Sequence, residues 1–205
     1  MITIVDYGVG NLISIKNMLK KGGIESKISS EKEDVLNADK LILPGVGSFD
    51  YGMKQLRMAG LADILNERVL NKKVPILGLC LGVQLLTGSS EEGNEKGLGW
   101  IKGKTVAFDK SKLSSSEKIP HMGWAEVKDF QQSKLFTGMY EEPRFYFVHS
   151  FHLQLENEAD KLASSRYGYD FTAGIEHDNI LGVQFHPEKS HKFGMKLLEN
   201  FAKYY

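Results

Sequence analysis

The amino-acid sequence predicts an α/β fold, in which a mostly parallel central sheet has helices on both faces and continues into a smaller, partly antiparallel section. Two observations predict it. In the first half, short apolar runs alternate with segments whose apolar residues recur at helical spacing, as in strands joined by crossover helices. In the second half, short strand candidates follow one another with only turns between them, which favours antiparallel neighbours.

Strands and helices alternate through the first half of the chain. Helical spacing is clearest in Asn11–Lys21, where Leu12, Ile15 and Leu19 share a face and Gly22-Gly23 follows as a stop signal. The predicted strands are Met1–Val5, Lys40–Leu43 and Val74–Leu79, and the further helical segments are Met53–Met58, Leu61–Leu70 and one that begins with Leu81–Leu86.

The second half is expected to form short strands before a last helix. The polar, serine-rich segment Lys110–Lys118 is predicted to be a solvated hairpin loop. The sequence shows neither a repeat nor a linker, so residues 1–205 are expected to form a single domain. The predicted strands are Lys104–Phe108, Ala125–Val127, Phe145–Val148, Leu162–Ser165, Thr172–Glu176 and Ile180–Phe185, and the last helix is His191–Ala202.

Composition excludes several classes of protein. In the 205 residues, 26 Lys and Arg balance 26 Asp and Glu, so the basic excess of a nucleic-acid or polybasic membrane binder is missing. The N-terminus has no basic region before its apolar run, unlike a signal peptide. The most apolar stretch, Val74–Leu86, is only about 13 residues long, too short to span a bilayer. We expect a cytoplasmic protein that binds neither nucleic acid nor membranes.

No cofactor or metal site is predicted. Gly8-Val9-Gly10 has Ile13 where a dinucleotide-binding motif needs its third glycine. Because Cys80 is the only cysteine, an internal disulfide and a multi-cysteine zinc site are both excluded. His149 and His152 lie three apart in a strand-like run, so they should face opposite sides and make a poor metal pair. The other candidates, His121, His177 and His191, are expected at the surface or at caps.

The most informative segment is Gly78-Leu79-Cys80-Leu81-Gly82, which joins an apolar strand to a helical run. This is the pattern of a nucleophile elbow, with Cys80 in the nucleophile position. The glycines are needed because the sharp turn strains its central residue and brings other backbone close. A free thiol is about 3% thiolate at neutral pH, and a helix N-terminus and an imidazolium would raise that fraction. The alternative is a buried structural cysteine, which is the commoner use of a lone cysteine.

A second segment supplies a base and its partner. The strand ending at Phe185 delivers His186, and Pro187 favours extended backbone at His186. Residues i and i+2 of an extended segment share a face about 7 Å apart. Glu188 can therefore reach the ring nitrogen that does not face the thiol, fix the tautomer and stabilise the imidazolium. A His-x-Glu pattern alone is weak, but it becomes specific beside a cysteine elbow.

A glycine-rich loop, Pro44-Gly45-Val46-Gly47, follows the second predicted strand. Such a loop beside the nucleophile can present backbone N–H groups to a developing oxyanion. The N–H of Leu81, the residue after the nucleophile, is the natural second donor. Taken alone, the loop is more typical of an ordinary turn after a strand.

These segments together resemble class I glutamine amidotransferases. The resemblance also includes Pro120-His121-Met122-Gly123-Trp124 and Tyr146-Phe147-Val148-His149-Ser150, and it extends over essentially the whole chain. The elbow and His-Pro-Glu are specific to the class. The PGVG, PHMGW and FVHS segments are most similar to those of the glutaminase subunits of imidazole glycerol phosphate synthases.

The resemblance implies a reaction. Cys80 would attack the side-chain amide of glutamine, His186 would act as base and then as acid, and Glu188 would orient His186. The thioester would be hydrolysed to glutamate through an oxyanion held by the amides of Leu81 and Val46. No cofactor or metal is implied. Matching positions for glutamine binding are the side chains of Gln84 and Glu92 and the backbone of Gly47, Ser150 and Phe151.

The resemblance also implies a partner. Ammonia would pass to a (β/α)8-barrel cyclase that makes imidazole glycerol phosphate and an aminoimidazole carboxamide ribotide in histidine biosynthesis, and the two subunits would form a heterodimer. Asn11 and Lys189 match positions that face this cyclase, and Trp124 is expected at the same interface.

Two departures leave the ammonia acceptor open. The subfamily commonly has Asn after PHMGW, whereas Ala125 follows here, and Thr87-Gly88-Ser89-Ser90 is more polar than usual. The alternative is a paralogous glutaminase that supplies a sugar amidotransferase of surface-polysaccharide synthesis. Two other classes remain: a catalytically silent scaffold, and a cysteine hydrolase that needs no partner.

Overall fold

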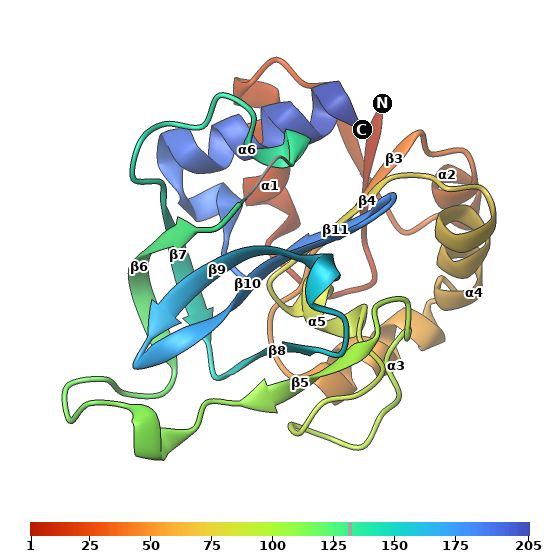
Figure 1. The fold of residues 1–205 in the computed structure, drawn as a ribbon. Coiled ribbons are helices and arrows are strands. Elements are labelled where there is room, and N and C mark those ends of the chain that lie inside the picture. Colours follow the sequence, from red (N-terminus) through yellow and green to blue (C-terminus); the bar gives the residue numbers. More distant parts are fainter. Residues whose placement is uncertain (131–132) are drawn as a thin grey trace.

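A computed structural model of the chain describes residues 1–130 and 133–205. Its strands form one sheet in the order β2-β1-β3-β4-β11-β10-β9-β6-β7, with β8 pairing β10 and β5 pairing β8 beside this path. Figure 1 shows the sheet running through the middle of the molecule between two sets of helices. The predicted architecture, a mostly parallel part followed by a partly antiparallel part, is confirmed.

The parallel part of the sheet comes from the first half of the chain and one late strand. Each of its neighbours pairs in parallel register, including β4 with β11, where Gly78 lies opposite Gly182. Parallel strands with both faces covered are expected to be apolar throughout, and β1, β4 and β11 are buried at every position. The strands are β2 (Ser26–Ser29), β1 (Ile2–Val5), β3 (Lys40–Leu43), β4 (Ile76–Leu79) and β11 (Ile180–Val183).

The antiparallel part is built by the remaining strands. They pair through β10–β11, β10–β9, β9–β6 and β6–β7, and β8 joins β10 to β5. The strands are β5 (Gly103–Ala107), β6 (His121–Lys128), β7 (Arg144–His149), β8 (Phe151–Leu155), β9 (Lys161–Tyr167) and β10 (Tyr169–His177).

Helices cover both faces of the parallel strands, as predicted. Side chains alternate across β3, so Ile42 packs in one core while Leu41 and Leu43 pack in the other. The core of Ile42 is covered by α1 (Leu12–Lys21) and α6 (His191–Tyr204), and the core of Leu41 and Leu43 by α2 (Lys32–Leu36), α3 (Phe49–Met58), α4 (Ala62–Asn66) and α5 (Leu81–Leu85).

Three details of the strands and their connections differ from the sequence-based expectation. Lys110–Lys118 is exposed but is not a hairpin, because β5 before it pairs with β8 while β6 after it pairs with β7 and β9. Strand β2 was not predicted, because it lies at the sheet edge with mostly half-exposed, polar residues. Strand β8 was not predicted either, because it follows β7 after the single residue Ser150 and reads as the same apolar run.

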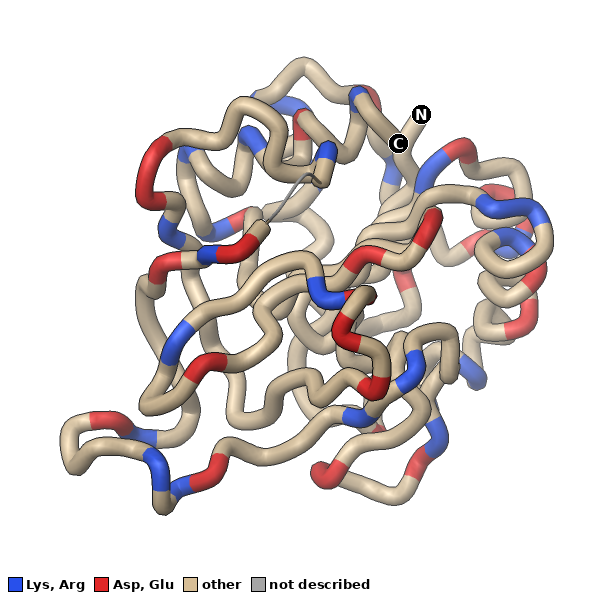
Figure 2. The backbone as a smooth tube through the Cα atoms, in the orientation of Figure 1, with Lys and Arg blue, Asp and Glu red and all other residues tan. Residues whose placement is uncertain are grey.

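Residues of both charge signs are interspersed along the chain (Figure 2). Many form surface pairs, such as Arg57 with Glu95 and Lys104 with Glu91. Across the two described ranges, no helix is both long enough and apolar enough to pass through a bilayer.

The junction between β4 and α5 depends on backbone contact that only glycine permits. A Cβ atom at Gly82 would overlap the carbonyl oxygen of Leu43 in β3. A Cβ atom at Gly78 would lie 2.8 Å from the amide nitrogen of Val83. The predicted collision of side chains at positions 78 and 82 with neighbouring backbone is therefore confirmed, and the turn at Cys80 is fixed against β3.

We expect Gly82→Ala to lower the free energy of unfolding by about 3 kcal/mol or more, because backbone at Leu43 must move to admit the methyl group. Urea unfolding followed by circular dichroism measures the change. Gly88→Ala is the matched control, because its Cβ would meet only ordinary contacts, and it should stay within about 1 kcal/mol of the unsubstituted chain. Equal stability of the two variants would contradict this account of the junction.

Candidate active site

Cys80 occupies a strained turn between β4 and α5. Its φ of +53° lies in the left-handed region, which non-glycine residues seldom adopt. The turn is held because the Cys80 amide donates to Val183 (2.9 Å) and its carbonyl accepts from Val83 (3.2 Å). The predicted elbow geometry is thus confirmed. The thiol stands at the start of α5, whose first amides have no acceptor within the helix.

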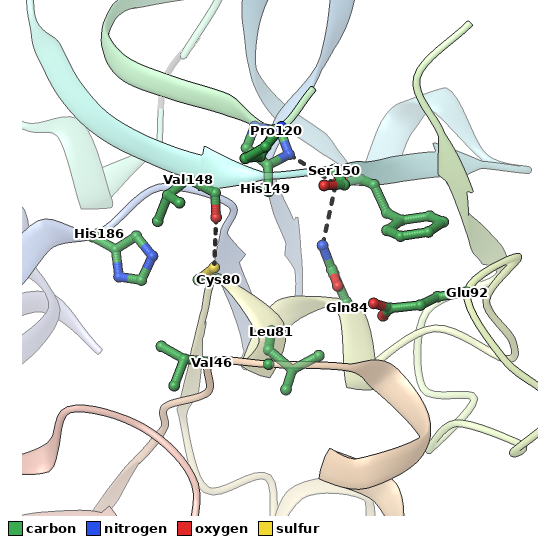
Figure 3. Close-up of a pocket in the computed structure, with 12 residues that line it drawn as sticks. Val46, Cys80, Leu81, Gln84, Glu92, Pro120, Val148, His149, Ser150 and His186 are labelled. Carbon is green, nitrogen blue, oxygen red and sulfur yellow. Dashed lines mark hydrogen bonds between the residues drawn. The ribbon is translucent and has the colours of Figure 1, made fainter. Parts of the chain in front are cut away.

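His186 and Glu188 form a buried pair, and Figure 3 shows the His186 ring near the Cys80 sulfur. The ring Nδ1 lies 2.7 Å from Glu188 Oε1, and the two side chains are only 2% and 3% exposed. His186 is extended, and Pro187 starts a single 3-10 turn that brings Glu188 back to the ring. Because Nδ1 donates to the carboxylate, Nε2 is the nitrogen left for chemistry, and within the described ranges it meets no other hydrogen-bonding atom in good geometry.

The surroundings of His186 favour its charged form. Burial opposes the charge and lowers its pKa, but the Cys80 thiol and the Glu188 carboxylate outweigh burial and raise that pKa to about 10. The ring therefore holds a proton at neutral pH between a sulfur and a carboxylate. An imidazolium in this position can stabilise a thiolate and later donate a proton to a leaving group.

The Pro44–Gly47 loop packs directly on the elbow. The buried Tyr7 hydroxyl donates to the Pro44 carbonyl at 2.6 Å, and a Cβ at Gly45 would lie 2.8 Å from the Gly82 amide nitrogen. Burial, and after it the neighbouring Cys80, raise the pKa of Tyr7. By contrast Val46 is 44% exposed. The start of the loop is therefore fixed against the elbow, while Val46 stands at its open side.

The thiol opens into a cavity of about 270 Å³, near the lower end of the usual range for small-ligand sites. The structure brings the predicted glutamine-binding and oxyanion residues together around it. Of the other predicted residues, Glu188 lies behind His186, and Asn11, Trp124 and Lys189 lie outside. The lining residues are Val46, Gly47, Cys80, Leu81, Gln84, Glu92, Pro120, Val148, His149, Ser150, Phe151 and His186.

Two amide side chains link the cavity to the sulfur. Gln84 Nε2 donates to the Phe151 carbonyl (3.2 Å) and to Gln184 Oε1 (3.0 Å). Gln184 Nε2 in turn points at the Cys80 sulfur, 3.9 Å away. Sequence reasoning missed Gln184. Its position two residues before His186 in a predicted strand was a usable signal, because such residues share a face.

Glu92 lines the same cavity and is held by a helix start. Its carboxylate accepts from the Phe49 amide at 2.8 Å, in the first turn of α3, where negative charge is favoured. The Ser90 hydroxyl accepts from the Glu92 amide at 3.1 Å. A carboxylate in this position can meet the ammonium group of an amino-acid ligand.

Besides His186, three histidines lie buried near the cavity, and the placement of each differs from the expectation. His121, expected at the surface or a cap, is 4% exposed. His149 and His152, expected on opposite sides, both pack on Phe108, with ring centroids 5.2 and 4.8 Å from it. The reason is the break at Ser150 between β7 and β8, which resets the alternation of side chains. The described residues contain no group of three or more potential metal ligands.

The histidine pair His121–His149 is uncharged. His149 Nδ1 lies 2.7 Å from the Phe151 carbonyl, so it must donate there, and His149 Nε2 then accepts from His121 Nδ1 at 3.1 Å. Burial lowers the pKa of His121 to about 4 and that of His149 to about 3. Gln84 and His149 therefore hold the same Phe151 carbonyl without adding charge to the cavity.

The three residues expected at a partner interface occupy two places. Trp124 is 46% exposed and stacks on His191, with ring centroids 5.4 Å apart. Trp124 also contacts Tyr146, whose ring lies 5.6 Å from the Lys189 ammonium. Asn11 caps α1 by accepting from the Ser14 amide at 3.4 Å. The structure thus brings Trp124 and Lys189 together around Tyr146, and Asn11 belongs to a separate element.

The histidine pair predicts acid sensitivity. Between the ordinary pKa of about 6.5 and the lowered values, the unfolded chain binds protons that the folded chain does not. The contribution of this pair to the free energy of unfolding should therefore be complete above about pH 6.5 and be lost toward about pH 4. In urea unfolding, His121→Gln should reduce this slope by up to about 1.4 kcal/mol per pH unit. His177→Gln, in a half-exposed pair with Asp160, is the control, and equal slopes in both variants would refute the assignment.

Comparison with known proteins agrees with this site. A family model, glutamine amidotransferase class-I, matches residues 3–204. The chain is 56% identical to imidazole glycerol phosphate synthase subunit HisH 2 of Methanococcus maripaludis and 50% identical to the subunit of that name from Pseudomonas aeruginosa, each over 99% of both chains. A solved glutamine amidotransferase shares the fold, with a TM-score of 0.73 at 21% identity over 98% of this chain and 96% of the other. The predicted resemblance is confirmed, and the chain belongs to the glutamine amidotransferase class-I family, among the HisH subunits.

Proposed function

We propose that this chain is a glutaminase subunit that hydrolyses L-glutamine to glutamate and ammonia and delivers the ammonia to a separate cyclase subunit. The observation that carries the proposal is the buried His186–Glu188 pair beside the strained Cys80, at one end of a cavity of amino-acid size. The relatives named as subunits of imidazole glycerol phosphate synthase support histidine biosynthesis as the setting. We further propose that residues 1–205 form a single domain and that the protein is located in the cytoplasm.

The reaction begins at the sulfur. The Cys80 thiolate attacks the side-chain amide carbon of glutamine, and the carbonyl oxygen becomes an oxyanion that the amides of Leu81 and Val46 stabilise. The His186 imidazolium protonates the departing nitrogen, so ammonia leaves and a thioester forms. His186, now neutral, takes a proton from water, which attacks the thioester and releases glutamate through a second oxyanion. Glu188 keeps the ring oriented throughout.

The cavity supplies groups for the amino-acid end of glutamine. Glu92 offers a carboxylate to the substrate ammonium group. Gln84 has its Nε2 engaged by Phe151 and Gln184, which leaves its Oε1 as an acceptor. The backbone of Gly47, Ser150 and Phe151 supplies further contacts along the wall. A glutamine held by these groups would place its amide toward Cys80.

The surface around the cavity fits a partner. Trp124, Met122 and Val46 are exposed by 46%, 61% and 44%, and large exposed apolar side chains are typical of protein–protein contacts. Val46 lines the cavity, and Met122 lies two residues after the lining residue Pro120. We place the cyclase of the heterodimer here, with Trp124, Lys189 and Asn11 at the contact, so that docking reaches the proposed oxyanion amide of Val46.

The alternative acceptor, a sugar amidotransferase, gains no support. The named relatives are synthase subunits of the histidine type. Ala125, whose departure from the usual Asn motivated the alternative, packs against the core that α1 and α6 cover. Its side chain thus gives no reason for a different partner.

We expect ammonia release from glutamine to rise at least about ten-fold when a barrel cyclase of histidine biosynthesis and its ribonucleotide substrate are added. A coupled glutamate assay measures this. Cys80→Ala should abolish turnover, because no other group described in the cavity is a comparable nucleophile. Failure of the cyclase to stimulate turnover would remove the histidine-pathway assignment, and undiminished turnover by Cys80→Ala would remove the chemistry.

Glu188→Gln should lower kcat by about 100-fold or more while changing KM little, because the neutral amide no longer stabilises the imidazolium at Nδ1. Steady-state kinetics with saturating cyclase measures both constants. Glu176→Gln is the control: this carboxylate accepts from the Tyr205 hydroxyl, away from the cavity. Equal kcat values for the two variants would contradict the role of Glu188.

Trp124→Ala should weaken cyclase binding by about ten-fold or more, because a large aromatic contact at the centre of an interface is lost. Titration calorimetry with the cyclase measures the dissociation constant. Met58→Ala is the matched control, because Met58 is 80% exposed at the end of α3, away from the strand that carries Trp124. Unchanged affinity in Trp124→Ala would move the interface elsewhere.

A further inference from the structure

We propose that Gln184 is a further residue of the reaction, whose side-chain amide donates a hydrogen bond to the Cys80 sulfur and favours its thiolate form. This deepens the proposed function and rests on it, since Cys80 is taken as the nucleophile. Gln184 is fully buried and lies 3.9 Å from the sulfur through its Nε2 atom. The sulfur therefore has an amide donor from Gln184, and it also lies beside the His186 ring.

Backbone hydrogen bonds fix where Gln184 stands. Its amide donates to the Ala173 carbonyl at 2.9 Å, and the His186 amide donates to the Tyr146 carbonyl at 2.9 Å. The segment therefore stays extended beyond Val183, where β11 ends. Because alternate residues of an extended segment share a face, Gln184 and His186 approach the sulfur from the same stretch of chain.

The orientation of the Gln184 amide follows from a chain of donors and acceptors. The Phe151 carbonyl can only accept, so the end of Gln84 that meets it must be the donor Nε2. That same Nε2 also contacts Gln184, so the facing end of Gln184 must be the acceptor Oε1. Gln184 is thereby forced to turn its own Nε2, with its N–H, toward the sulfur. The Phe151 carbonyl thus fixes the orientation of both side-chain amides, Gln84 and Gln184.

A backbone carbonyl near the sulfur makes a nearby hydrogen-bond donor necessary for a thiolate. The Val148 carbonyl oxygen lies 4.0 Å from Sγ, close enough to accept weakly from a thiol. A thiolate has no proton to give and meets a partial negative charge there. In a buried site such interactions are only weakly screened. The Gln184 N–H offsets this repulsion and stabilises the Cys80 thiolate before any substrate is bound.

The reaction of Cys80 with iodoacetamide tests the proposal without glutamine, because alkylation consumes the thiolate. For each variant the quantity is the rate at about pH 7 divided by the rate at about pH 9.5, where most free thiols are ionised. We expect Gln184→Met to lower this ratio by about five- to ten-fold, since a hydrogen bond to a charged group is lost. Gln184→Asn, one methylene shorter, should lower it similarly while keeping a buried amide.

Asn200→Leu is the matched control. Asn200 is a buried amide in α6 that donates to the Leu135 and Thr137 carbonyls, and neither contact involves the sulfur. It should lower stability and leave the alkylation ratio unchanged. The proposal is overturned if both Gln184 variants keep the ratio of the unsubstituted chain, or if Asn200→Leu lowers it equally. Because the assay omits glutamine, altered alkylation in a chain that hydrolyses no glutamine would refute the proposed function alone.

Discussion

The close passage of Gly82 against the Leu43 carbonyl is the constraint on which the site depends. It lets β4 turn into α5 directly beneath the end of β3, so Cys80 takes a φ that its side chain would otherwise avoid. The same contact brings the Pro44–Gly47 loop onto the elbow, where Tyr7 holds its first carbonyl. The close contact between Gly82 and Leu43 therefore positions both the proposed nucleophile and the oxyanion loop. The strained φ of Cys80 is tolerated because the neighbouring strands on both sides hold the turn in that conformation.

The hydrogen-bonded groups around the sulfur and the Phe151 carbonyl divide into a charged pair and a neutral set. His186 and Glu188 form a buried ionic pair beside the sulfur, whereas the groups gathered at the Phe151 carbonyl are neutral: the Gln84–Gln184 amides and the His121–His149 imidazoles. A second charged group beside the sulfur would compete with the thiolate for the His186 imidazolium, or it would draw the thiolate away from the substrate. The pKa values follow this division: burial lowers those of His121 and His149, whereas the neighbouring thiol and carboxylate raise that of His186.

The sequence allows prediction of what depends on local pattern. The elbow is readable because its glycines stand at fixed positions around Cys80, and Glu188 is readable because it lies two residues from His186. The burial of His121 could not be predicted, because its partner His149 comes from a strand distant in sequence. Gln184 was missed although it shares a face with His186, because its partners Gln84 and Cys80 lie about a hundred residues earlier in the chain. Strand β8 was missed for a similar reason: the single residue Ser150 separates it from β7, and only pairing with β5 and β10 reveals the bend.

One part of the site is held firmly by the sheet and another part is not, which explains why a partner would be needed. Cys80, His186 and Gln184 are buried and tied to the sheet by backbone hydrogen bonds. Val46 is 44% exposed, and Gly47 after it has a φ of +100°, a conformation from which glycine moves at little cost. The proposed nucleophile is therefore held in place in the isolated chain, while the loop proposed to carry one oxyanion donor stays exposed at the surface beside the cavity. A subunit that docks on this surface can act on the oxyanion loop without disturbing the sulfur, which joins ammonia release to the presence of its acceptor.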